Sequence, residues 1–244
     1  QVVELRKQLN DASSTMKVLK NSLARIAAED TPFSELADQF TQTRALVYSD
    51  GDPVLQAKVL SEAAKNIDNL KKLSLPFDNI HTLVCSQGIV AYDRKEFEID
   101  TFKKIIDLNL NSVMASCSFF HENLVKNKGS IVIIGTGASY HAVKGNPAYS
   151  ASKGGLLTLI KTLAEAWAIN GIRVNGIAPG YVATKLTEVT FGNEKRYENS
   201  LKNIPLKRWG SPKDMGEVCC FLCSEGASYV TGQMITVDGG MSLS

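Results

Sequence analysis

The sequence lacks any apolar run that approaches the roughly 20 residues of a membrane-spanning helix, and it lacks the hydrophobic segment of a secretory signal. It also lacks an excess of one charge, because 27 Lys and Arg residues against 25 Asp and Glu give a formal net charge of +2. We therefore expect no membrane contact. Any nucleic-acid binding would have to come from a local basic patch.

Histidine is scarce, and the number of cysteines is odd. The three histidines are scattered, and the five cysteines lie in apolar surroundings. This pattern favours free buried thiols in a reducing compartment over a disulfide framework. We therefore expect an intracellular protein, cytoplasmic or mitochondrial. We expect no metal site, since the cysteines of "CCFLC" (219–223) have no histidine nearby in sequence.

A glycine-rich turn is missing from the first 80 residues. A dinucleotide-binding half needs a first strand followed by such a turn, because only glycine lets the backbone approach a pyrophosphate at a helix N-terminus. "GTGAS" (135–139) follows a later strand and lacks the third glycine that would open a helix, so we do not interpret it as that turn. The chain begins at Gln1 without methionine, and we expect its natural start to lie upstream or to have been removed.

What the sequence does contain, from His81 onward, is a clear alternation of strands and helices. "HTLVC", "SIVIIG", "IRVNGIAP" and "QMITVDGG" are apolar strand patterns, and helical patterns separate them. This alternation predicts an α/β fold with a Rossmann-like, doubly wound parallel sheet whose first strand and glycine-rich turn are absent from this chain. We expect a small α/β segment over 1–75 and a larger unit over 76–244.

The stretch "YSASK" (149–153) carries candidate chemistry. Residues four apart share one face of a helix, so Tyr149 and Lys153 can point into one pocket. An ammonium beside a phenol favours the phenolate, which predicts a lowered pKa for Tyr149 and a general acid/base close to neutral pH. The same spacing also occurs on ordinary helix surfaces, so the pair needs further support.

Other residues supply that support in a fixed order along the chain. Asn109 lies in "LNL", Thr136 stands thirteen residues before Tyr149, "APG" (178–180) follows the next strand, and "VDGG" ends the last one. With "YSASK", these signatures from about residue 78 onward resemble the short-chain dehydrogenase/reductase family. The resemblance covers about two thirds of the chain.

This resemblance implies hydride transfer between NAD or NADP and a secondary alcohol or ketone. It implies that Tyr149 is the acid/base and that Lys153 lowers its pKa and holds the nicotinamide ribose. It implies that Thr136 bonds the substrate oxygen and that the Asn109 region holds a proton-relay water. The catalytic set is therefore Asn109, Thr136, Tyr149 and Lys153. The implied cofactor-binding residues are Gly88, Tyr149, Lys153, Pro179, Gly180 and Thr184.

Two family positions differ here, since the usual serine is Thr136 and the usual "NNAG" is "CSQG" (85–88). Residues 186–210 stand where the family carries its mobile substrate lid. The helices at 101–125 and 149–169 stand where the family forms its dimer interface, so the resemblance implies a homo-oligomer.

The first part of the chain carries a second resemblance. The patterns "KVLKNSLARIA" and "DPVLQAKVLSEAAK", within residues 1–72, resemble the bacterial and mitochondrial stalk-base protein ten of the large ribosomal subunit. This likeness implies contacts with large-subunit rRNA through Arg6, Lys7, Lys17, Lys20 and Arg25. Residues 1–75 contain ten Lys and Arg against ten Asp and Glu, so the same residues could equally be a solvated helix face.

Residues 1–43 can also be interpreted as a dehydrogenase half cut just after its glycine turn. "QVVELRKQL" would then be the first helix, "MKVL" the second strand and "RALVY" the third, with Asp50 or Asp52 on the adenine side. Two hypotheses follow for the whole chain. It is an NAD(P)-dependent oxidoreductase, or it is a mitochondrial ribosomal component whose dehydrogenase-like half is structural.

Overall fold

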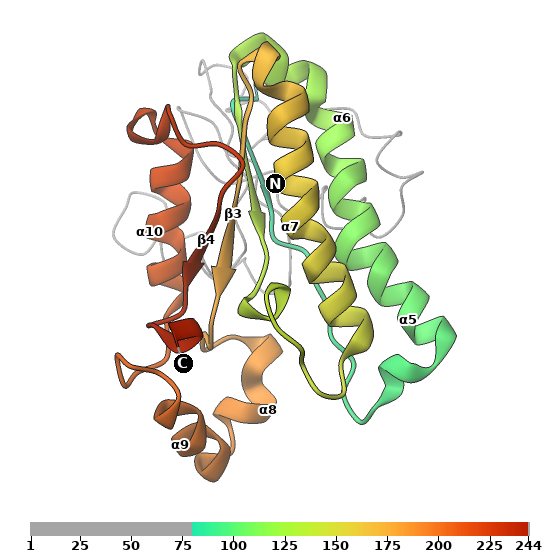
Figure 1. Ribbon diagram of the computed structural model, residues 1–244, viewed down its shortest axis with the longest axis vertical. Coiled ribbons are helices and arrows are strands. Elements are labelled where there is room, and N and C mark those ends of the chain that lie inside the picture. Colours follow the sequence, from blue (N-terminus) through green and yellow to red (C-terminus); the bar gives the residue numbers. More distant parts are fainter. Residues whose placement is uncertain (1–79, 244) are drawn as a thin grey trace, which may run out of the picture.

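Four parallel strands form the centre of the computed structural model, which describes residues 80–243 (Figure 1). The strands are β1 (Thr82–Cys85), β2 (Ser130–Ile134), β3 (Arg173–Pro179) and β4 (Met234–Val237). They pair in the order β1-β2-β3-β4, and every pair is parallel. The side chains of β1 are all buried, and those of β2 and β3 nearly all, as expected for a sheet covered on both faces. The Rossmann-like α/β prediction is confirmed.

Helices cover both faces of this sheet (Figure 1). On one face lie α5 (Ile99–Ile106), α6 (Ser112–Asn127) and α7 (Pro147–Trp167), and on the other lies α10 (Pro212–Cys223). Two short helices, α8 (Glu188–Phe191) and α9 (Glu194–Lys202), lie beyond the carboxyl ends of the strands. No helix of residues 80–243 is long and apolar enough to cross a bilayer.

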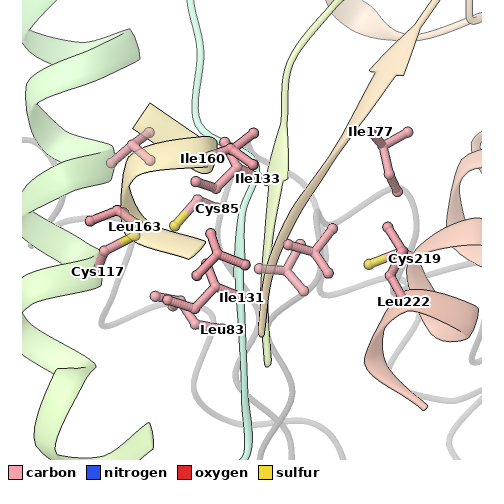
Figure 2. Close-up of a cluster of buried hydrophobic side chains, with 14 of the residues drawn as sticks. Leu83, Cys85, Cys117, Ile131, Ile133, Ile160, Leu163, Ile177, Cys219 and Leu222 are labelled. Atoms are coloured by element: carbon pink, nitrogen blue, oxygen red, sulfur yellow. The ribbon is translucent and has the colours of Figure 1, made fainter. Parts of the chain in front are cut away.

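The core lies in two layers, one on each side of the sheet. Figure 2 shows Cys85 and Cys117 in the layer under α6 and α7, and Cys219 in the layer under α10. All three thiols are buried. The pKa of the Cys117 thiol is raised well above its ordinary value, first by a hydrogen bond with Cys85 and then by burial. All three thiols fill space in the core, and the raised pKa of Cys117 keeps that thiol protonated and unreactive.

One predicted helix is interrupted in the structure. The sequence predicts a single helix over 101–125, but the chain forms α5, then a π-helical turn η3 (Asp107–Asn111), then α6. A π-turn adds one residue to the helix and rotates the side chains at that point. Here it directs Asn109 inward, where it is fully buried. The predicted helix at 149–169 is α7, which begins two residues earlier because Pro147 occupies its first position.

The segment predicted to be a substrate lid, residues 186–210, folds around one tryptophan. Trp209 stacks on Tyr181 with ring centroids 5.0 Å apart and also contacts Phe191 and Tyr197. Its indole nitrogen donates a hydrogen bond to Ser200 Oγ at 2.6 Å. This predicted lid segment therefore packs on an aromatic cluster that it shares with Tyr181. It is joined to the loop after β1 by the Tyr92 hydroxyl, which donates to the Leu186 carbonyl at 2.9 Å.

Helix α10 begins with a reciprocal capping box. The Asp214 backbone N–H donates to Ser211 Oγ, the Ser211 backbone N–H donates back to the Asp214 carboxylate, and Arg208 adds two further bonds to that carboxylate. The hydrogen bonds from Arg208 and Ser211 hold the pKa of Asp214 well below its ordinary value. The Asp214 carboxylate thus stabilises the fold in its charged form.

We expect Asp214→Asn to lower the free energy of unfolding at pH 7 by about 1 kcal/mol, the scale of one helix cap. A lowered pKa in the folded state gives stability that is complete above the ordinary value of 3.8 and is lost as the pH falls below it. The deficit should therefore shrink in acid, as measured by urea unfolding at pH 7 and pH 3. Glu217→Gln, an exposed change on the same helix, is the control and should have no effect. A deficit that persists unchanged at pH 3 would contradict the role of the charge.

The predictions for the first part of the chain lie outside the described residues. They include the boundary between residues 75 and 76, the missing first strand and turn, and the adenine-side aspartates. They also include the rRNA contacts expected at Arg6, Lys7, Lys17, Lys20 and Arg25.

Candidate active site

The sequence-predicted site residues gather at the carboxyl ends of neighbouring strands. Gly88 follows β1, Thr136 follows β2, and Pro179 ends β3. A Cβ added to Gly137 would lie 3.8 Å from the Pro179 carbonyl oxygen, so the loop after β2 lies against the end of β3. In open parallel sheets this edge is where ligands bind.

Lys153 lies at the centre of this edge and is only 4% exposed. Its Nζ donates to the Ile134 carbonyl at the end of β2 at 2.9 Å, and to the Gln87 carbonyl after β1 at 3.5 Å. A Cβ added to Gly88 would lie 3.2 Å from the same Nζ, so the backbone at Gly88 passes directly beside the ammonium group. Lys153 therefore connects the ends of β1 and β2 to α7.

Tyr149 stands one turn before Lys153, in the first turn of α7. A hydrogen bond between its phenol and the Thr136 side chain brings together these two predicted residues. Ser139, three residues after Thr136, donates its hydroxyl to the Lys153 carbonyl at 2.9 Å. The loop after β2 is thus fixed against the helix that carries Tyr149.

The predicted lowering of the Tyr149 pKa is wrong for this structure. Burial of the phenol raises the pKa above its ordinary value of 10 and outweighs the hydrogen bond from Thr136, which lowers it. The neighbouring Tyr92 and Glu96 raise the pKa further. At neutral pH Tyr149 therefore holds its proton, which suits a group that donates a proton to a substrate.

Asn109 is buried and joins three segments. Its Oδ1 accepts from the Ile89 backbone N–H at 2.8 Å, while its Nδ2 donates to the Ile89 carbonyl at 2.9 Å and to Ser152 Oγ at 3.1 Å. Both amide protons are used, so the side chain braces the loop after β1 against α7. The proton-relay water expected near Asn109 stays a prediction.

The remaining predicted residues lie around the end of β3. The Gly180 backbone N–H donates to the Val237 carbonyl, and a Cβ at Gly180 would lie 2.7 Å from Asp238 Cβ, so only glycine fits this approach of β3 to β4. The Thr184 backbone N–H donates to Thr187 Oγ1 at 3.1 Å, at the start of the short 3₁₀ helix η6 (Lys185–Thr187). The structure therefore places Pro179 beside the loop after β2, Gly180 against the end of β4, and Thr184 just before the segment predicted to be a lid.

Sequence reasoning missed two buried residues of this site. Ser152 Oγ donates to the Tyr149 carbonyl at 2.8 Å and accepts from Asn109. It could have been found, since it lies within "YSASK" and three residues from Tyr149 on the helix. The other is Glu96, whose carboxylate accepts the Tyr149 backbone N–H at 2.8 Å. No spacing in the sequence indicates that contact, because 53 residues separate the two.

Comparison with known proteins identifies the family. The family model for enoyl-(acyl carrier protein) reductase matches residues 15–242. This chain belongs to the short-chain dehydrogenase/reductase family. Over 168 residues it is 38% identical to a 2-dehydro-3-deoxy-D-gluconate 5-dehydrogenase of Bacillus subtilis, with 67% of this chain and 66% of the relative covered. The chain therefore spans about two thirds of the length of that relative.

Two solved structures are similar to this member of the family. One is a candidate 2-deoxy-D-gluconate 3-dehydrogenase from Agrobacterium tumefaciens with bound NADP (TM-score 0.63, 34% identity, 68% of each chain covered). The other is a gluconate 5-dehydrogenase from Burkholderia cenocepacia in complex with NADP and tartrate (TM-score 0.66, 28% identity, 75% of this chain and 71% of that chain covered).

The family match begins inside the segment that resembles the ribosomal stalk-base protein. None of the three relatives described above is a ribosomal protein. The comparisons therefore give no support to a ribosomal part, to rRNA binding or to a mitochondrial location, and the ribosomal hypothesis is not favoured.

Proposed function

We propose that this chain is an NAD(P)-dependent oxidoreductase that interconverts a ketone and a secondary alcohol. The observation that carries the proposal is the cluster of Thr136, Tyr149 and Lys153 at the carboxyl edge of the sheet. A hydroxyl, a protonated phenol and a buried ammonium there give hydrogen-bond donors for a substrate oxygen and for a ribose diol. The names of two relatives, a 2-dehydro-3-deoxy-D-gluconate 5-dehydrogenase and a gluconate 5-dehydrogenase, support the same reaction.

The described residues fit the nicotinamide end of such a cofactor. Gly88 has no side chain, so nothing separates its backbone from the Lys153 ammonium, and Gly180 allows the ends of β3 and β4 to approach closely. Lys153 would hold the ribose hydroxyls, and Pro179, Gly180 and Thr184 would line the nicotinamide side. The bound cofactor supplies the hydride; the pyrophosphate side lies outside the described residues.

The chain's own residues would handle the proton. Thr136 would donate a hydrogen bond to the substrate oxygen, and Tyr149 would give its phenolic proton to that oxygen as the carbonyl carbon is reduced. Because its pKa is raised, the Tyr149 phenol is protonated at neutral pH. In the chain without ligands, Tyr149 therefore has the protonation state that reduction of a ketone requires.

We further propose that the substrate is a polyhydroxy acid or its keto form. The support comes from the names of relatives, which are a 2-dehydro-3-deoxy-D-gluconate 5-dehydrogenase and a gluconate 5-dehydrogenase. We also propose that the chain forms homo-oligomers through the helical segments 101–125 (α5 to α6) and 149–169 (α7), as the family resemblance implies. Size-exclusion chromatography with light scattering measures this directly, and a monomer at micromolar concentration would contradict it.

Cofactor binding tests the proposed function first. We expect NADPH or NADH to bind with a Kd in the micromolar range, about −8 kcal/mol, as measured by cofactor fluorescence. Lys153→Met should weaken binding by roughly 10- to 100-fold, because it removes charge-assisted hydrogen bonds. Lys161→Met is the matched control, since Lys161 lies on the same helix but is exposed, and it should bind as the wild type does.

A panel of ketones then tests the reaction and the substrate class. Reduction of keto-sugar acids, followed by loss of NAD(P)H absorbance at 340 nm, is the expected result. Reduction of 3-oxoacyl thioesters alone would keep the reaction and overturn the substrate class. Absence of cofactor binding at millimolar concentration, with the fold intact by circular dichroism, would overturn the proposed function itself.

A further inference from the structure

The first turn of α7, which carries Tyr149, is not capped by its own residues. Asn146 is the residue before the helix, and its side chain makes no capping bond there. The N–H of Tyr149 is at the third helical position, where no carbonyl of the helix itself can accept it, so it needs a partner from elsewhere. That partner is Glu96, whose Oε2 accepts it at 2.8 Å from 53 residues earlier in the chain.

The other oxygen of Glu96 fixes the surroundings of this cap. Oε1 accepts from the Ala91 backbone N–H and from Asn146 Nδ2, each at 3.0 Å. Asn146 Nδ2 also donates to the Ala91 carbonyl at 2.9 Å. One carboxylate thus holds the segment 91–97, the residue before α7 and the first turn of α7 in a single network.

Glu96 is fully buried, with 0% exposure. A buried carboxylate is costly unless its oxygens are hydrogen bonded. Here three N–H donors and the positive end of a helix stabilise it. An apolar side chain of this size would leave the N–H groups of Ala91 and Tyr149 without acceptors, so the carboxylate is tied to the position of the Tyr149 backbone.

We propose that Glu96 is the positioning residue of Tyr149: it holds the backbone of Tyr149 in place and keeps a negative charge near the phenol. This inference rests on the proposed function, in which Tyr149 is the proton donor. Small displacements of a reacting group are costly in enzymes, so a cap on the very residue that carries the phenol has direct consequences for the rate.

The electrostatic part of this role follows from the groups around the phenol. Thr136 approaches from the loop after β2, Tyr92 and Glu96 from the segment after β1, and Lys153 lies one turn further along α7. Among them Glu96 is the carboxylate, and its negative charge disfavours the phenolate. Burial is the main cause of the raised pKa of Tyr149, and the charge of Glu96 adds to it in the same direction.

Two variants of Glu96 separate its effect on the position of the Tyr149 backbone from the effect of its charge on the phenol. Glu96→Gln keeps the size of the side chain, removes the charge and replaces one acceptor with a donor. Glu96→Asp keeps the charge and shortens the reach. Glu98→Gln is the matched control, because Glu98 is exposed, lies two residues away and makes no side-chain bond to the helix that it precedes.

We expect both Glu96 variants to lower kcat for ketone reduction by roughly tenfold, while Glu98→Gln has the wild-type kcat. The pH profile separates the two roles. In Glu96→Gln the midpoint for loss of activity at high pH should move to lower pH, and in Glu96→Asp it should stay near the wild-type position. Wild-type kcat and wild-type midpoints in both variants would overturn the proposal.

The pKa of Tyr149 can also be measured without any enzymatic activity, so the role of Glu96 can be tested even if the proposed function is wrong. The ionisation of Tyr149 can be followed by NMR of chain labelled with ¹³Cζ-tyrosine, with Tyr149→Phe to assign the signal. A lower midpoint in Glu96→Gln, with Glu98→Gln unchanged, supports the role of Glu96 even if no tested ketone is reduced. If Glu96→Gln does not fold, backbone amide exchange in the wild type decides. The Tyr149 N–H should be protected despite its place in the first helical turn, and fast exchange would overturn the proposal.

Discussion

Replacing Tyr149 by Phe is expected to lower kcat for ketone reduction by about 10²- to 10⁴-fold, the usual contribution of a general acid. The change removes only the hydroxyl, which carries the proton and bonds with Thr136. The backbone N–H of Tyr149, held by Glu96, and its carbonyl, held by Ser152, are unaffected. Steady-state kinetics at saturating NAD(P)H measure the loss at the chemical step.

The control for this change is Tyr229→Phe, since Tyr229 is fully exposed. It should show wild-type kcat and the wild-type melting temperature. Cofactor fluorescence on Tyr149→Phe shows whether binding is also affected, because the resemblance assigns this phenol to the cofactor as well as to the substrate. A Tyr149→Phe chain that keeps kcat within about twofold of the wild type contradicts the assignment of Tyr149 as the acid.

The removal of this hydroxyl also has a pH signature. The pKa of Tyr149 is higher in the folded chain than its ordinary value, so burial of the neutral phenol stabilises the fold below about pH 10, and this contribution is lost as the pH rises further. In Tyr149→Phe no group titrates at this position. The variant should therefore lose less stability than the wild type in alkali.

Much of this site could be predicted from the sequence because its residues lie at fixed places relative to regular elements. Tyr149 and Lys153 are four apart on a helix, and Thr136 and Pro179 mark the ends of apolar strands. Parallel strands bring their carboxyl ends to one edge, so the order of elements is enough to gather these side chains. The parallel sheet itself follows from the same alternation of strands and helices.

The rest depends on contacts that local patterns do not contain. Glu96 reaches Tyr149 across 53 residues, and an acidic residue in an exposed-looking stretch gives no sign of full burial. The π-turn that directs Asn109 inward cannot be recognised from the spacing of apolar residues in the sequence. The direction of the Tyr149 pKa was mispredicted because helix spacing shows the neighbouring lysine but does not show the desolvation of the phenol.

These distant contacts have a common target, the first two turns of α7. The Glu96 carboxylate accepts the Tyr149 N–H, and Ser139 donates its hydroxyl to the Lys153 carbonyl. Ser152 Oγ donates to the Tyr149 carbonyl and accepts a hydrogen bond from Asn109, so it links the two. The backbone of Tyr149 and Lys153, the two residues proposed to act on substrate and cofactor, is therefore held by segments that follow β1 and β2. Pre-organisation of this kind lets side chains act without a large reorganisation in the reaction.

Asn109 tests this argument most directly, because its side chain joins the loop after β1 to α7. We expect Asn109→Ala to lower the free energy of unfolding by about 2–4 kcal/mol, since it leaves the Ile89 N–H and carbonyl and one side of Ser152 without partners. The melting temperature should fall by roughly 5–15 °C. Urea unfolding gives the free energy, and kinetics at a temperature where the variant is folded give the effect on kcat.

Asn111→Ala is the matched control, because Asn111 lies in the same π-turn but is exposed, and its amide bonds only Asp107 among the side chains around it. It should change the free energy of unfolding by less than about 0.5 kcal/mol. A similar loss in both variants would mean that the turn itself, and not the inward amide, carries the stability. If Asn109→Ala loses stability but keeps wild-type kcat when folded, Asn109 braces the sheet edge without positioning Tyr149. A loss in both quantities instead means that the position of the proposed proton donor depends on contacts with the loop after β1.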